Sequence, residues 1–490
     1  MIQNDKGIVG LKHRIMEDVA RLAWDDKLDY EHMEALEEEI IPGPRPSYRC
    51  CVYKEREIVR QRIKLATGQN TKANQGSKSI VQVIKPACDE CSIASYSVTD
   101  NCRVCLGQPC MSACKFGAIS RGPHRTYIDP SKCKECGLCA QACPFDAIVH
   151  LVRPCKRACP VDAISFDEYG FCHIDEEKCI SCGHCIHSCP FGAIGSKTFL
   201  TQIISEIKAG KEIYAMCAPA AEGQFGADIS MESIRVALKE TGFTDMVEVG
   251  LGGDMTAAYE AAEWSEAYKE GKKMTTSCCP AFINMLKKHF PQQFEENMSS
   301  TVSPMCAVSR YLKYLHPGCV TVFVGPCIAK KTEADDKSVP DNADYVITFG
   351  ELLSLFKSKG VELKPVETNY QEASLFGKKF AGSGGVAAAV IECMQERGED
   401  TSEIKLQTCA GGNECKKALT LLKMGRLPAD FIEGMICVGG CVGGPSNTVA
   451  TNEIVKARNK LFDNADDRKI LSNLENYPMD KFSMHRDGHI

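Results

Sequence analysis

The 490-residue sequence lacks the features that mark several classes of protein. No apolar run reaches the roughly 18 residues that a membrane-spanning helix needs, so we expect no membrane association. The N-terminal stretch MIQNDKGIVGLKHRIMEDV has no apolar core, no cleavage site and no twin-arginine pair, which argues against export and predicts a cytoplasmic protein. The net charge of -6 gives no sign of the basic patch that nucleic-acid binding needs, so we expect no nucleic-acid partner.

Cysteine, by contrast, is abundant, with 30 residues. In a secreted protein this number would suggest disulfides. Many of these cysteines stand in C-x₂-C runs, however, and in a cytosolic chain such runs favour metal binding. A hydrophobic fraction of 44% and a charged fraction of 25% are typical of a soluble globular protein. At roughly 150 residues per domain, the length predicts about two to four domains.

Changes in composition divide the chain into four expected segments. Residues 1–84 contain charged helical patterns on either side of the loop PGPRPS. Residues 85–198 hold 17 cysteines and many Gly and Pro residues. In residues 199–455, β-rich runs such as EIYAMCA, DMVEVG, TVFVG and YVITF alternate with helical patterns, which predicts an α/β domain with parallel strands. Residues 456–490 form a charged tail, expected as a helix with a loose end.

Half of a ferredoxin motif stands alone in the cysteine-rich segment. The stretch RPCKRACPVDAIS, Arg153–Ser165, carries the back half of the bacterial pattern C-x₂-C-x₂-C-x₃-C-P, with Cys155 and Cys159, but lacks the front half. A C-x₂-C pair without a back half, Cys88 and Cys91, lies upstream. The other runs are complete, and each precedes a small turn such as PFGAI. They are Cys102, Cys105, Cys110, Cys114; Cys133, Cys136, Cys139, Cys143; and Cys179, Cys182, Cys185, Cys189.

We infer that one two-cluster ferredoxin, over residues 95–150, is inserted into the first motif of another, which predicts α+β ferredoxin-like modules. Their sixteen thiolates suffice for four [4Fe–4S] clusters in series. Such an electron-transfer chain implies a redox centre at one end. Zinc, which uses separated cysteine pairs, and scattered free thiols are the alternatives. The fourth cysteine of each run ligates the neighbouring cluster in such ferredoxins. The predicted sets are Cys88, Cys91, Cys155, Cys189; Cys179, Cys182, Cys185, Cys159; Cys102, Cys105, Cys110, Cys143; and Cys133, Cys136, Cys139, Cys114.

Three more cysteine-bearing stretches lie far apart in the second half. They are TTSCCPAF (275–282), VGPCIAKKTEAD (324–335) and EGMICVGGCVGG (433–444). In each stretch a cysteine lies between an apolar run and a Gly/Pro turn or a helix start. None is a cluster motif by itself, but together they could supply four thiolates to one further cubane.

In their order and separation, these stretches resemble the three signature loops of the iron-only ([FeFe]) hydrogenases, and the resemblance extends over residues of about 85 to 450. In that family the loops hold the H-cluster, a [4Fe–4S] cubane bridged by a cysteine to a two-iron unit with CO, cyanide and azadithiolate. The resemblance implies that Cys279, Cys327, Cys437 and Cys441 ligate the cubane and that Cys441 bridges to the two-iron unit.

The resemblance also implies roles around the two-iron unit. Lys330 would donate to a cyanide, and Glu333 would hold that loop. The stretch CAPA, with Pro219 and Ala220, resembles the segment whose backbone meets the other cyanide. Further cofactor-binding positions implied by the resemblance are Phe380 and Ser383 in the Gly-rich wall FAGSGGV, and Met435.

A proton relay is implied as well. Cys278 would be the free thiol that passes protons to the azadithiolate amine, and the relay would continue through Glu260, Ser299 and Glu263. The two glutamates lie three residues apart on a helix expected to begin near Asp254, so they share one face. By themselves, two such glutamates are typical of a solvated helix face.

The sequence departs from the family pattern around the two-iron unit. Gly325-Pro326 replaces Met-Pro, Phe282 stands where Trp is usual, Met305 stands where Gln is expected, and the loop GGCVGGPSN lacks its usual Gln. These changes remove hydrogen-bond donors and bulk. They indicate a less studied branch and leave rate, catalytic bias and oxygen tolerance open.

The resemblance implies an anaerobic, ferredoxin-dependent oxidoreductase that catalyses 2 H⁺ + 2 e⁻ ⇌ H₂. Electrons would come from a ferredoxin or flavodoxin, and maturation proteins would assemble the cofactor. Two other classes stay open: a hydrogen or redox sensor with low turnover, and an iron–sulfur electron-transfer or assembly protein without a two-iron unit. The sequence leaves the oligomeric state and the role of residues 1–84 undecided.

Overall fold

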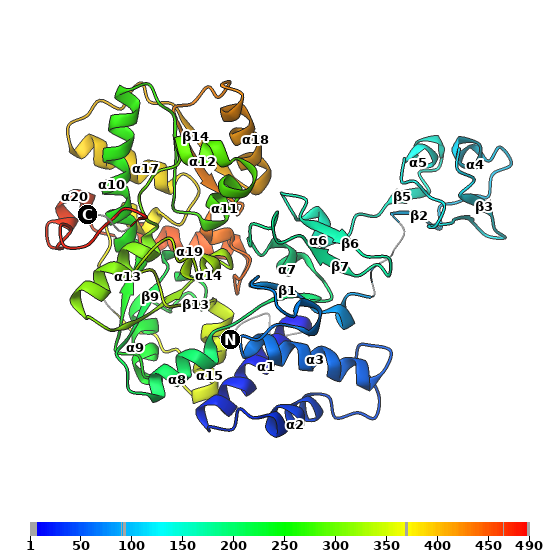
Figure 1. Cartoon of the computed structure of the whole chain (residues 1–490), viewed down its shortest axis with the longest axis horizontal. Helices are drawn as coiled ribbons and strands as arrows, with labels where there is room; N and C mark the ends of the chain where they lie inside the picture. The colour runs from blue at the N-terminus through cyan, green and yellow to red at the C-terminus, as the bar shows by residue number, and fades with distance from the viewer. Residues whose placement is uncertain (1–6, 90, 92–94, 368–370, 464, 488–490) are drawn as a thin grey trace.

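The computed structural model describes residues 7–89, 91, 95–367, 371–463 and 465–487 (Figure 1). A large body holds both chain ends, and a small module projects from it on one side. Within the part of the chain that the structure describes, no helix has the length and apolarity that a membrane crossing requires.

Three helices form the N-terminal region: α1 (Gly7–Trp24), α2 (Tyr30–Ile40) and α3 (Val52–Ala66). The two charged helical patterns correspond to α2 and α3, whereas α1 was not predicted. Ile15, Val19, Leu36 and Ile63 pack together between these helices. Other α1 side chains join the core of the α/β domain, and Trp24 Nε1 donates to Ser358 Oγ at 3.1 Å. The N-terminal region is therefore packed onto the domain that follows it.

The cysteine-rich segment forms short antiparallel strand pairs beside one-turn helices, as expected for ferredoxin-like modules. In the part joined to the body, β1 pairs with β8 and β6 pairs with β7. In the projecting module, β2 pairs with β5 and β3 with β4. The elements are β1 (Val81–Val83), β6 (Ile164–Phe166), β7 (Cys172–Ile174), β8 (Ile194–Ser196), α6 (Pro154–Arg157) and α7 (His184–Ser188), then β2 (Tyr96–Val98), β3 (Ile119–Arg121), β4 (Thr126–Ile128), β5 (Ile148–His150), α4 (Pro109–Ala113) and α5 (Leu138–Ala142), with short turns η1 (Lys72–Asn74) and η2 (Lys85–Ala87).

Glycine has a specific part in two of the cysteine loops. Gly137 and Gly183 precede α5 and α7 with φ of 76° and 81°, the left-handed region that glycine adopts without strain. This conformation turns the chain so that the next helix begins with a cysteine facing inward: Cys139 and Cys185 are both buried. In the run that begins at Cys102, Gln108 precedes helix α4 in the same way, with φ of 43°.

The α/β domain contains two parallel sheets, as the alternating pattern predicted. The first has the order β10 (Asp245–Glu248), β9 (Ile213–Cys217), β12 (Val320–Val324), β13 (Tyr345–Ile347). The second has the order β11 (Met274–Thr275), β15 (Phe431–Met435), β14 (Leu406–Ala410). Strands β9, β12 and β15 are buried along their whole length because both faces of each sheet are covered. The covering elements are α8 (Leu200–Lys208), η3 (Pro219–Ala221), α9 (Met231–Thr241), α10 (Val249–Lys269), α11 (Pro280–His289), α12 (Pro291–Asn297), α13 (Pro304–Leu315), α14 (Ala329–Ala334), α15 (Phe349–Lys359), α16 (Leu375–Lys379), α17 (Gly385–Glu396), α18 (Gly412–Lys423) and η4 (Cys441–Gly443).

Helix α10 begins at Val249, five residues before the expected start at Asp254. The glycines of VGLGGDM lie inside its first turns, although glycine is a poor helix former. A Cβ atom on Gly252 would lie 2.2 Å from the carbonyl oxygen of Pro304. The glycine therefore permits α10 and the start of α13 to touch, and this packing outweighs the helix propensity.

The C-terminal tail is more ordered than the sequence suggested. Helix α19 (Thr451–Asp463) spans the expected boundary at 455/456, and α20 (Ile470–Leu474) follows. The expectation of a loose end is wrong for residues 482–487, because Phe482 and Met484 are buried and Val302 N donates to Met484 O at 2.8 Å. Apolar side chains in a short charged stretch thus dock the tail on the domain.

Candidate functional site

The loops after several parallel strands meet at one end of the two sheets. TTSCCPAF follows β11, VGPC follows β12, and the last cysteine loop follows β15. Because the strands are parallel, their carboxyl ends lie on the same side, which is where open α/β sheets commonly form their sites. The three remote cysteine loops are brought together for this reason.

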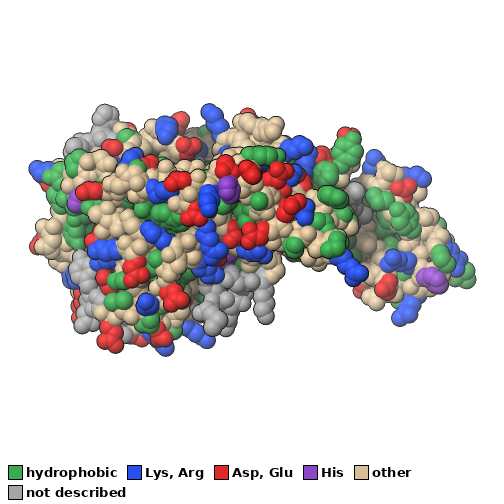
Figure 2. Space-filling model, turned by 90° about the horizontal axis from the view of Figure 1, so that it is seen from below, with side chains coloured by type: hydrophobic (Ala, Val, Ile, Leu, Met, Phe, Trp, Pro, Cys, Tyr) green, Lys and Arg blue, Asp and Glu red, His purple; other side chains and the backbone are tan. Residues whose placement is uncertain are grey.

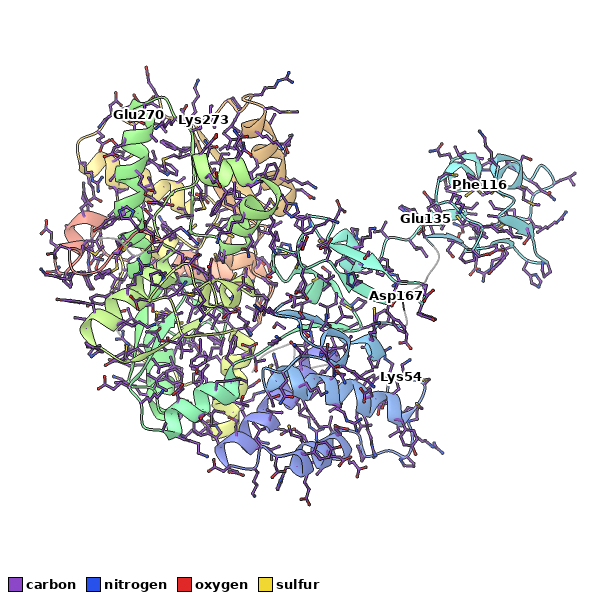
Figure 3. The ribbon with its side chains drawn as sticks, viewed as in Figure 1. Lys54, Phe116, Glu135, Asp167, Glu270 and Lys273 are labelled. Atoms are coloured by element: carbon purple, nitrogen blue, oxygen red, sulfur yellow. The ribbon has the colours of Figure 1, made fainter. Side chains whose placement is uncertain are left out.

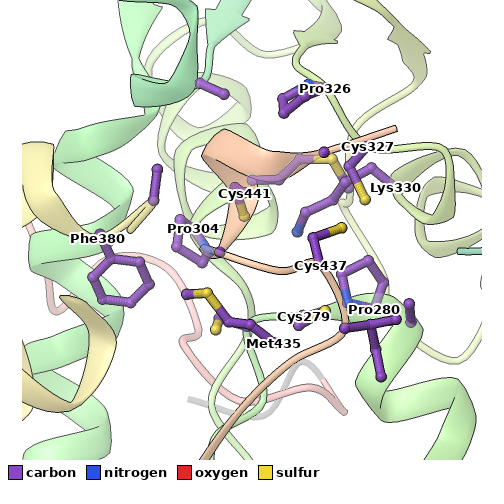
Figure 4. A pocket seen from close by; sticks show the side chains of 18 of the residues that line it. Cys279, Pro280, Pro304, Pro326, Cys327, Lys330, Phe380, Met435, Cys437 and Cys441 are labelled. Carbon is purple, nitrogen blue, oxygen red and sulfur yellow. The ribbon is translucent and has the colours of Figure 1, made fainter. Parts of the chain in front are cut away.

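These loops line one pocket with about 860 Å³ of free space, open solvent at its mouth included. Cys279, Cys327, Cys437 and Cys441 all face it, as does Lys330 (Figure 4). The other walls are largely apolar and include Pro280, Pro304, Met305, Pro326, Phe380 and Met435. Four thiols and one ammonium in an apolar pocket suit an anionic iron–sulfur group, since Fe–S cubanes are held by four cysteine thiolates.

Burial raises the pKa of all four thiols. Cys441 exposes much of its surface, but that surface faces the pocket, and burial still raises its pKa to about 11. At neutral pH the bare thiols would be protonated, so deprotonation must accompany metal binding.

Lys330 is fixed by a compact polar group at the pocket wall. Its Nζ lies 2.8 Å from Ser303 Oγ and 2.6 Å from a Glu333 carboxylate oxygen, and Ser303 Oγ donates to Glu333 Oε1 at 2.5 Å. Burial acts to lower the pKa of Lys330, but the charge of Glu333 outweighs it and the pKa is raised. The ammonium therefore stays charged. Sequence reasoning did not assign Ser303 a role, although a serine before Pro-x-x is a typical helix N-cap.

Cys278 and Glu260 form the inner part of a polar path. The Cys278 thiol lines the pocket, and burial raises its pKa well above the ordinary value. Glu260 Oε1 accepts hydrogen bonds from Ser277 N at 2.9 Å and Ser277 Oγ at 3.1 Å. The pKa of Glu260 is raised to about 7, chiefly by burial and to a smaller extent by the negative charge of the nearby Glu263.

The path continues from Glu260 to the surface. Ser299 Oγ donates to Glu263 Oε2 at 2.5 Å and is also close enough to Glu260 to lower that group's pKa. Glu263 is partly exposed and also accepts from Ser300, whose Oγ lies 2.8 Å from His485 Nδ1. Ser277, Ser300 and His485 had no signal in the sequence because their partners are remote along the chain.

The remaining expected pocket residues fall into two groups. Pro219, Phe380 and Met435 line the pocket. Ala220 is fully buried in η3, and Ser383, whose N donates to Gly439 O at 3.3 Å, is exposed; neither is among the described residues that line the pocket.

Two of the departures from the family pattern occupy different places. Met305 lines the pocket directly. Phe282 is completely buried beneath β15, where a Cβ on Gly434 would lie 2.4 Å from its ring. The aromatic ring at 282 therefore needs a glycine opposite, and its effect on the pocket is indirect.

The structure also brings the ferredoxin cysteines together in the predicted groups. Two small pockets in the projecting module are lined by one predicted set each: Cys102, Cys105, Cys110, Cys143 and Cys114, Cys133, Cys136, Cys139. In the other module, the charges of Cys189 and Cys155 raise the pKa of Cys91, and that of Cys159 raises the pKa of Cys179 and Cys182, so these thiols are neighbours. Ligation itself remains a prediction.

Two cysteines near these groups are informative. Cys182 also lines the pocket of the three remote cysteine loops. The predicted ligand set that contains Cys182 therefore lies directly against these loops. Cys172, which had no partner spacing in the sequence, is buried; its N donates to Cys88 Sγ at 3.3 Å, and a hydrogen bond from its thiol lowers the pKa of Cys155.

Comparisons with known proteins agree with this arrangement. Residues 211–445 match the family described as "Iron only hydrogenase large subunit, C-terminal domain", residues 126–149 match a 4Fe-4S binding domain, and residues 149–200 match the LdpA Fe-S cluster-binding domain. Iron hydrogenase 1 of Clostridium pasteurianum is 27% identical over 370 residues, which cover 65% of this chain and 64% of that protein. Protein NAR1 of Arabidopsis thaliana is 24% identical over 323 residues, covering 51% of this chain and 68% of that protein.

A solved structure of an [FeFe]-hydrogenase, described for the oxygen inactivation of its H cluster, is 20% identical. It covers 60% of this chain and 100% of its own, with a TM-score of 0.49. Residues 211–445 are therefore similar to the C-terminal domain of iron-only hydrogenase large subunits, and the cysteine-rich segment before them matches iron–sulfur binding domains.

Proposed function

We propose that the protein is an iron-only hydrogenase that catalyses 2 H⁺ + 2 e⁻ ⇌ H₂. The observation that carries the proposal is a single pocket that combines four cysteine thiols, a charged lysine and the inner end of a polar path to the surface. An electron carrier needs the first of these features but has no use for the other two.

The H-cluster, when bound, supplies the metal chemistry of hydrogen formation and cleavage. Cys279, Cys327, Cys437 and Cys441 would hold its cubane, with Cys441 bridging to the two-iron unit. Lys330, held between Ser303 and Glu333, would donate to a cyanide ligand and neutralise part of its charge. The apolar walls keep water away and strengthen this interaction.

Protons would move along the path from Cys278 to Glu263. Burial keeps the Cys278 thiol protonated, so it can donate a proton into the pocket and be reprotonated by Glu260. A carboxyl group with a pKa of about 7 exchanges protons in both directions near neutral pH. Ser299 bridges Glu260 to Glu263, where the path meets solvent.

Electrons would enter through the ferredoxin-like modules, one nested in the other. The pairing of β1 with β8 around the projecting module supports the nesting. The group of Cys179, Cys182, Cys185 and Cys159 would be the last stop before the pocket, because Cys182 lines it.

The projecting module is suited to an acidic protein carrier such as a ferredoxin or flavodoxin. Leu106 is 90% exposed, and Phe116, Tyr127 and Phe145 are also exposed. Figure 2 shows hydrophobic and basic side chains on the surface of the projecting module, and Figure 3 labels Phe116 on it. Opposite charge would steer the carrier and exposed apolar side chains would hold it. Between residues 95 and 152, basic residues outnumber acidic ones: Arg103, Lys115, Arg121, Arg125, Lys132 and Lys134 against Asp100, Asp129, Glu135 and Asp146.

A Cys278→Ala variant tests the proposal. We expect hydrogen evolution by the matured protein with a chemical reductant, and its loss in the variant by at least about 100-fold, since a proton-transfer group contributes roughly 10²–10⁴-fold. Electron paramagnetic resonance signals of the cubanes should be unchanged. Undiminished turnover in the variant would refute the proton-transfer role.

A second candidate is an assembly or electron-transfer protein, favoured by the similarity to the cytosolic Fe-S cluster assembly factor narfl of Xenopus tropicalis, which is 28% identical over 238 residues. Such a protein would lack hydrogen turnover and any two-iron unit. A matured wild-type protein that carries cubanes but produces no hydrogen would support this candidate. A sensor would show the two-iron unit with low turnover.

A further inference from the structure

A second cavity lies where three parts of the chain meet. It is lined by Lys12 and His13 from α1, Arg62 from α3, residues 186–198 of the outer ferredoxin-like module, the start of α15 and the loop 445–448. It has about 1250 Å³ of free space, open solvent included. Val9 and His187 are exposed at its edge, so the cavity opens to solvent. Neither the hydrogen chemistry nor the electron path uses it.

Two cations, Lys12 and Arg62, face this cavity, and the part of the chain that the structure describes gives neither of them a carboxylate partner. Arg62 is only 5% exposed; its Nη2 donates to Gly192 O at 2.5 Å, and its Nε makes no hydrogen bond to the described residues. Burial lowers the pKa of Arg62 to about 10. Burial, together with repulsion from Arg62, lowers the pKa of Lys12 to about 8. Among the described residues no carboxylate influences either pKa, although the charge of Cys189 acts to raise both and that of Tyr48 acts to raise the pKa of Arg62. Burying two such charges side by side is costly unless an anion joins them.

The rest of the lining also favours an anion. Among the described residues of the lining, the one carboxylate is that of Glu351, which is already engaged by Lys331 Nζ at 2.6 Å and by Thr348 N at 2.9 Å. The N-terminus of α15 faces the cavity, and its dipole attracts negative charge. The titratable neighbours are His13, His187 and Cys189, and Cys189 belongs to a predicted cluster group. Ile8, Met16 and Leu65 add an apolar wall.

We propose that this cavity binds a small phosphate-bearing molecule, with its phosphate between Lys12 and Arg62. A phosphate carries up to two negative charges and accepts several hydrogen bonds, which matches two cations beside a helix N-terminus. The apolar wall leaves room for an organic part, so the phosphate could be free or part of a nucleotide. The site goes beyond the proposed function, because it lies outside the catalytic pocket.

Equilibrium dialysis of the matured, full-length protein against radiolabelled inorganic phosphate tests the site. We expect one phosphate per chain at constant ionic strength, with binding about tenfold weaker or worse in Lys12→Gln. Arg62→Lys keeps a cation but loses the fork of donors and should also weaken binding. Lys337→Gln, at a side chain that is 90% exposed, is the matched control and should bind as the wild type does.

Competition by adenosine monophosphate decides the source of the phosphate. If adenosine monophosphate displaces the labelled phosphate at a concentration at least about tenfold lower than unlabelled phosphate needs, the site is assigned to a nucleotide. Weaker displacement assigns the site to free phosphate. Absence of bound phosphate, or equal binding by Lys12→Gln and wild type, would overturn the proposal and leave the predicted cluster at Cys189 as the sole counter-charge. Because the readout is bound phosphate, it is independent of hydrogen turnover.

Discussion

The projecting module and the pocket of the three remote loops both gather cysteines, but they do so in different ways. In the module, each predicted ligand set comes from residues within about forty positions of one another, held by short loops and one-turn helices. In the pocket, the cysteines come from three loops separated by many strands and helices and meet because parallel strands end together. Local spacing suffices to build an electron relay, whereas the pocket depends on the whole domain.

The two regions also differ in what surrounds the thiols. The module is small, and many of its apolar and basic side chains are exposed. The pocket has largely apolar walls and adds a charged lysine and a polar path to the surface. If this comparison is correct, substitutions in the pocket should change chemistry, and substitutions on the module surface should change only carrier docking.

The largest effect is expected for Lys330→Met. Removal of the ammonium leaves Glu333 and Ser303 without their cation and the two-iron unit without its hydrogen-bond donor. We therefore expect loss of the infrared bands of the two-iron unit and a fall in turnover of at least about 100-fold. Lys331→Met is the matched control, because Lys331 is equally buried but pairs with Glu351. The control should lose stability and keep the bands. Unchanged bands in Lys330→Met would remove the distinction between the pocket and an ordinary cluster site.

Glu260→Gln should have a similar effect on turnover without any effect on the clusters. The amide preserves hydrogen bonding but carries no transferable proton, so we expect turnover to fall by about 100-fold. Glu266→Gln, at an exposed position of the same helix, should leave the rate unchanged. Equal rates in both variants would mean that protons reach the pocket by another route.

Charge reversal on the module should have a smaller effect. We expect Lys115→Glu combined with Lys134→Glu to raise the KM for a reduced acidic carrier about tenfold at low salt, with the difference shrinking as salt is added. Turnover with a small chemical reductant should not change. Lys337→Glu on the catalytic body is the control. A similar KM increase in the control would mean that net charge, rather than the module, guides the carrier.

The smallest effect concerns stability. The pKa of Glu260 is raised from 4.5 to about 7 in the fold, so the folded state binds the extra proton between these values. The stabilisation from the neutral carboxyl group is complete below about pH 4.5 and is lost as the pH rises through 7. Thermal unfolding should therefore show that Glu260→Gln gains stability relative to the wild type above pH 7. A constant difference from pH 5 to 8 would show that Glu260 titrates normally.

Much of the cluster arrangement could be predicted because it is encoded locally. The pairing of CDEC with RPCKRACPVDAIS followed from two incomplete motifs, and the parallel sheets followed from apolar runs that alternate with helices. The three remote loops could be combined only through the family resemblance, since no spacing links Cys279 to Cys441.

The features that escaped prediction depend on long-range packing. Ser303 meets Lys330 and Glu333 across about thirty residues, and His485 meets Ser300 across 185. The early start of α10 depends on the contact between Gly252 and Pro304. The role of Lys12 and Arg62 was invisible because their cavity forms only when three parts of the chain come together.

The central claim is that three remote cysteine loops hold one six-iron centre. Infrared spectroscopy of the protein, matured and purified without oxygen, tests it most directly. The account predicts sharp bands from CO and cyanide that disappear when Cys441 is replaced by serine, while signals of the four accessory cubanes persist. A spectrum of the matured wild-type protein with cubanes and no bands from CO or cyanide would contradict it.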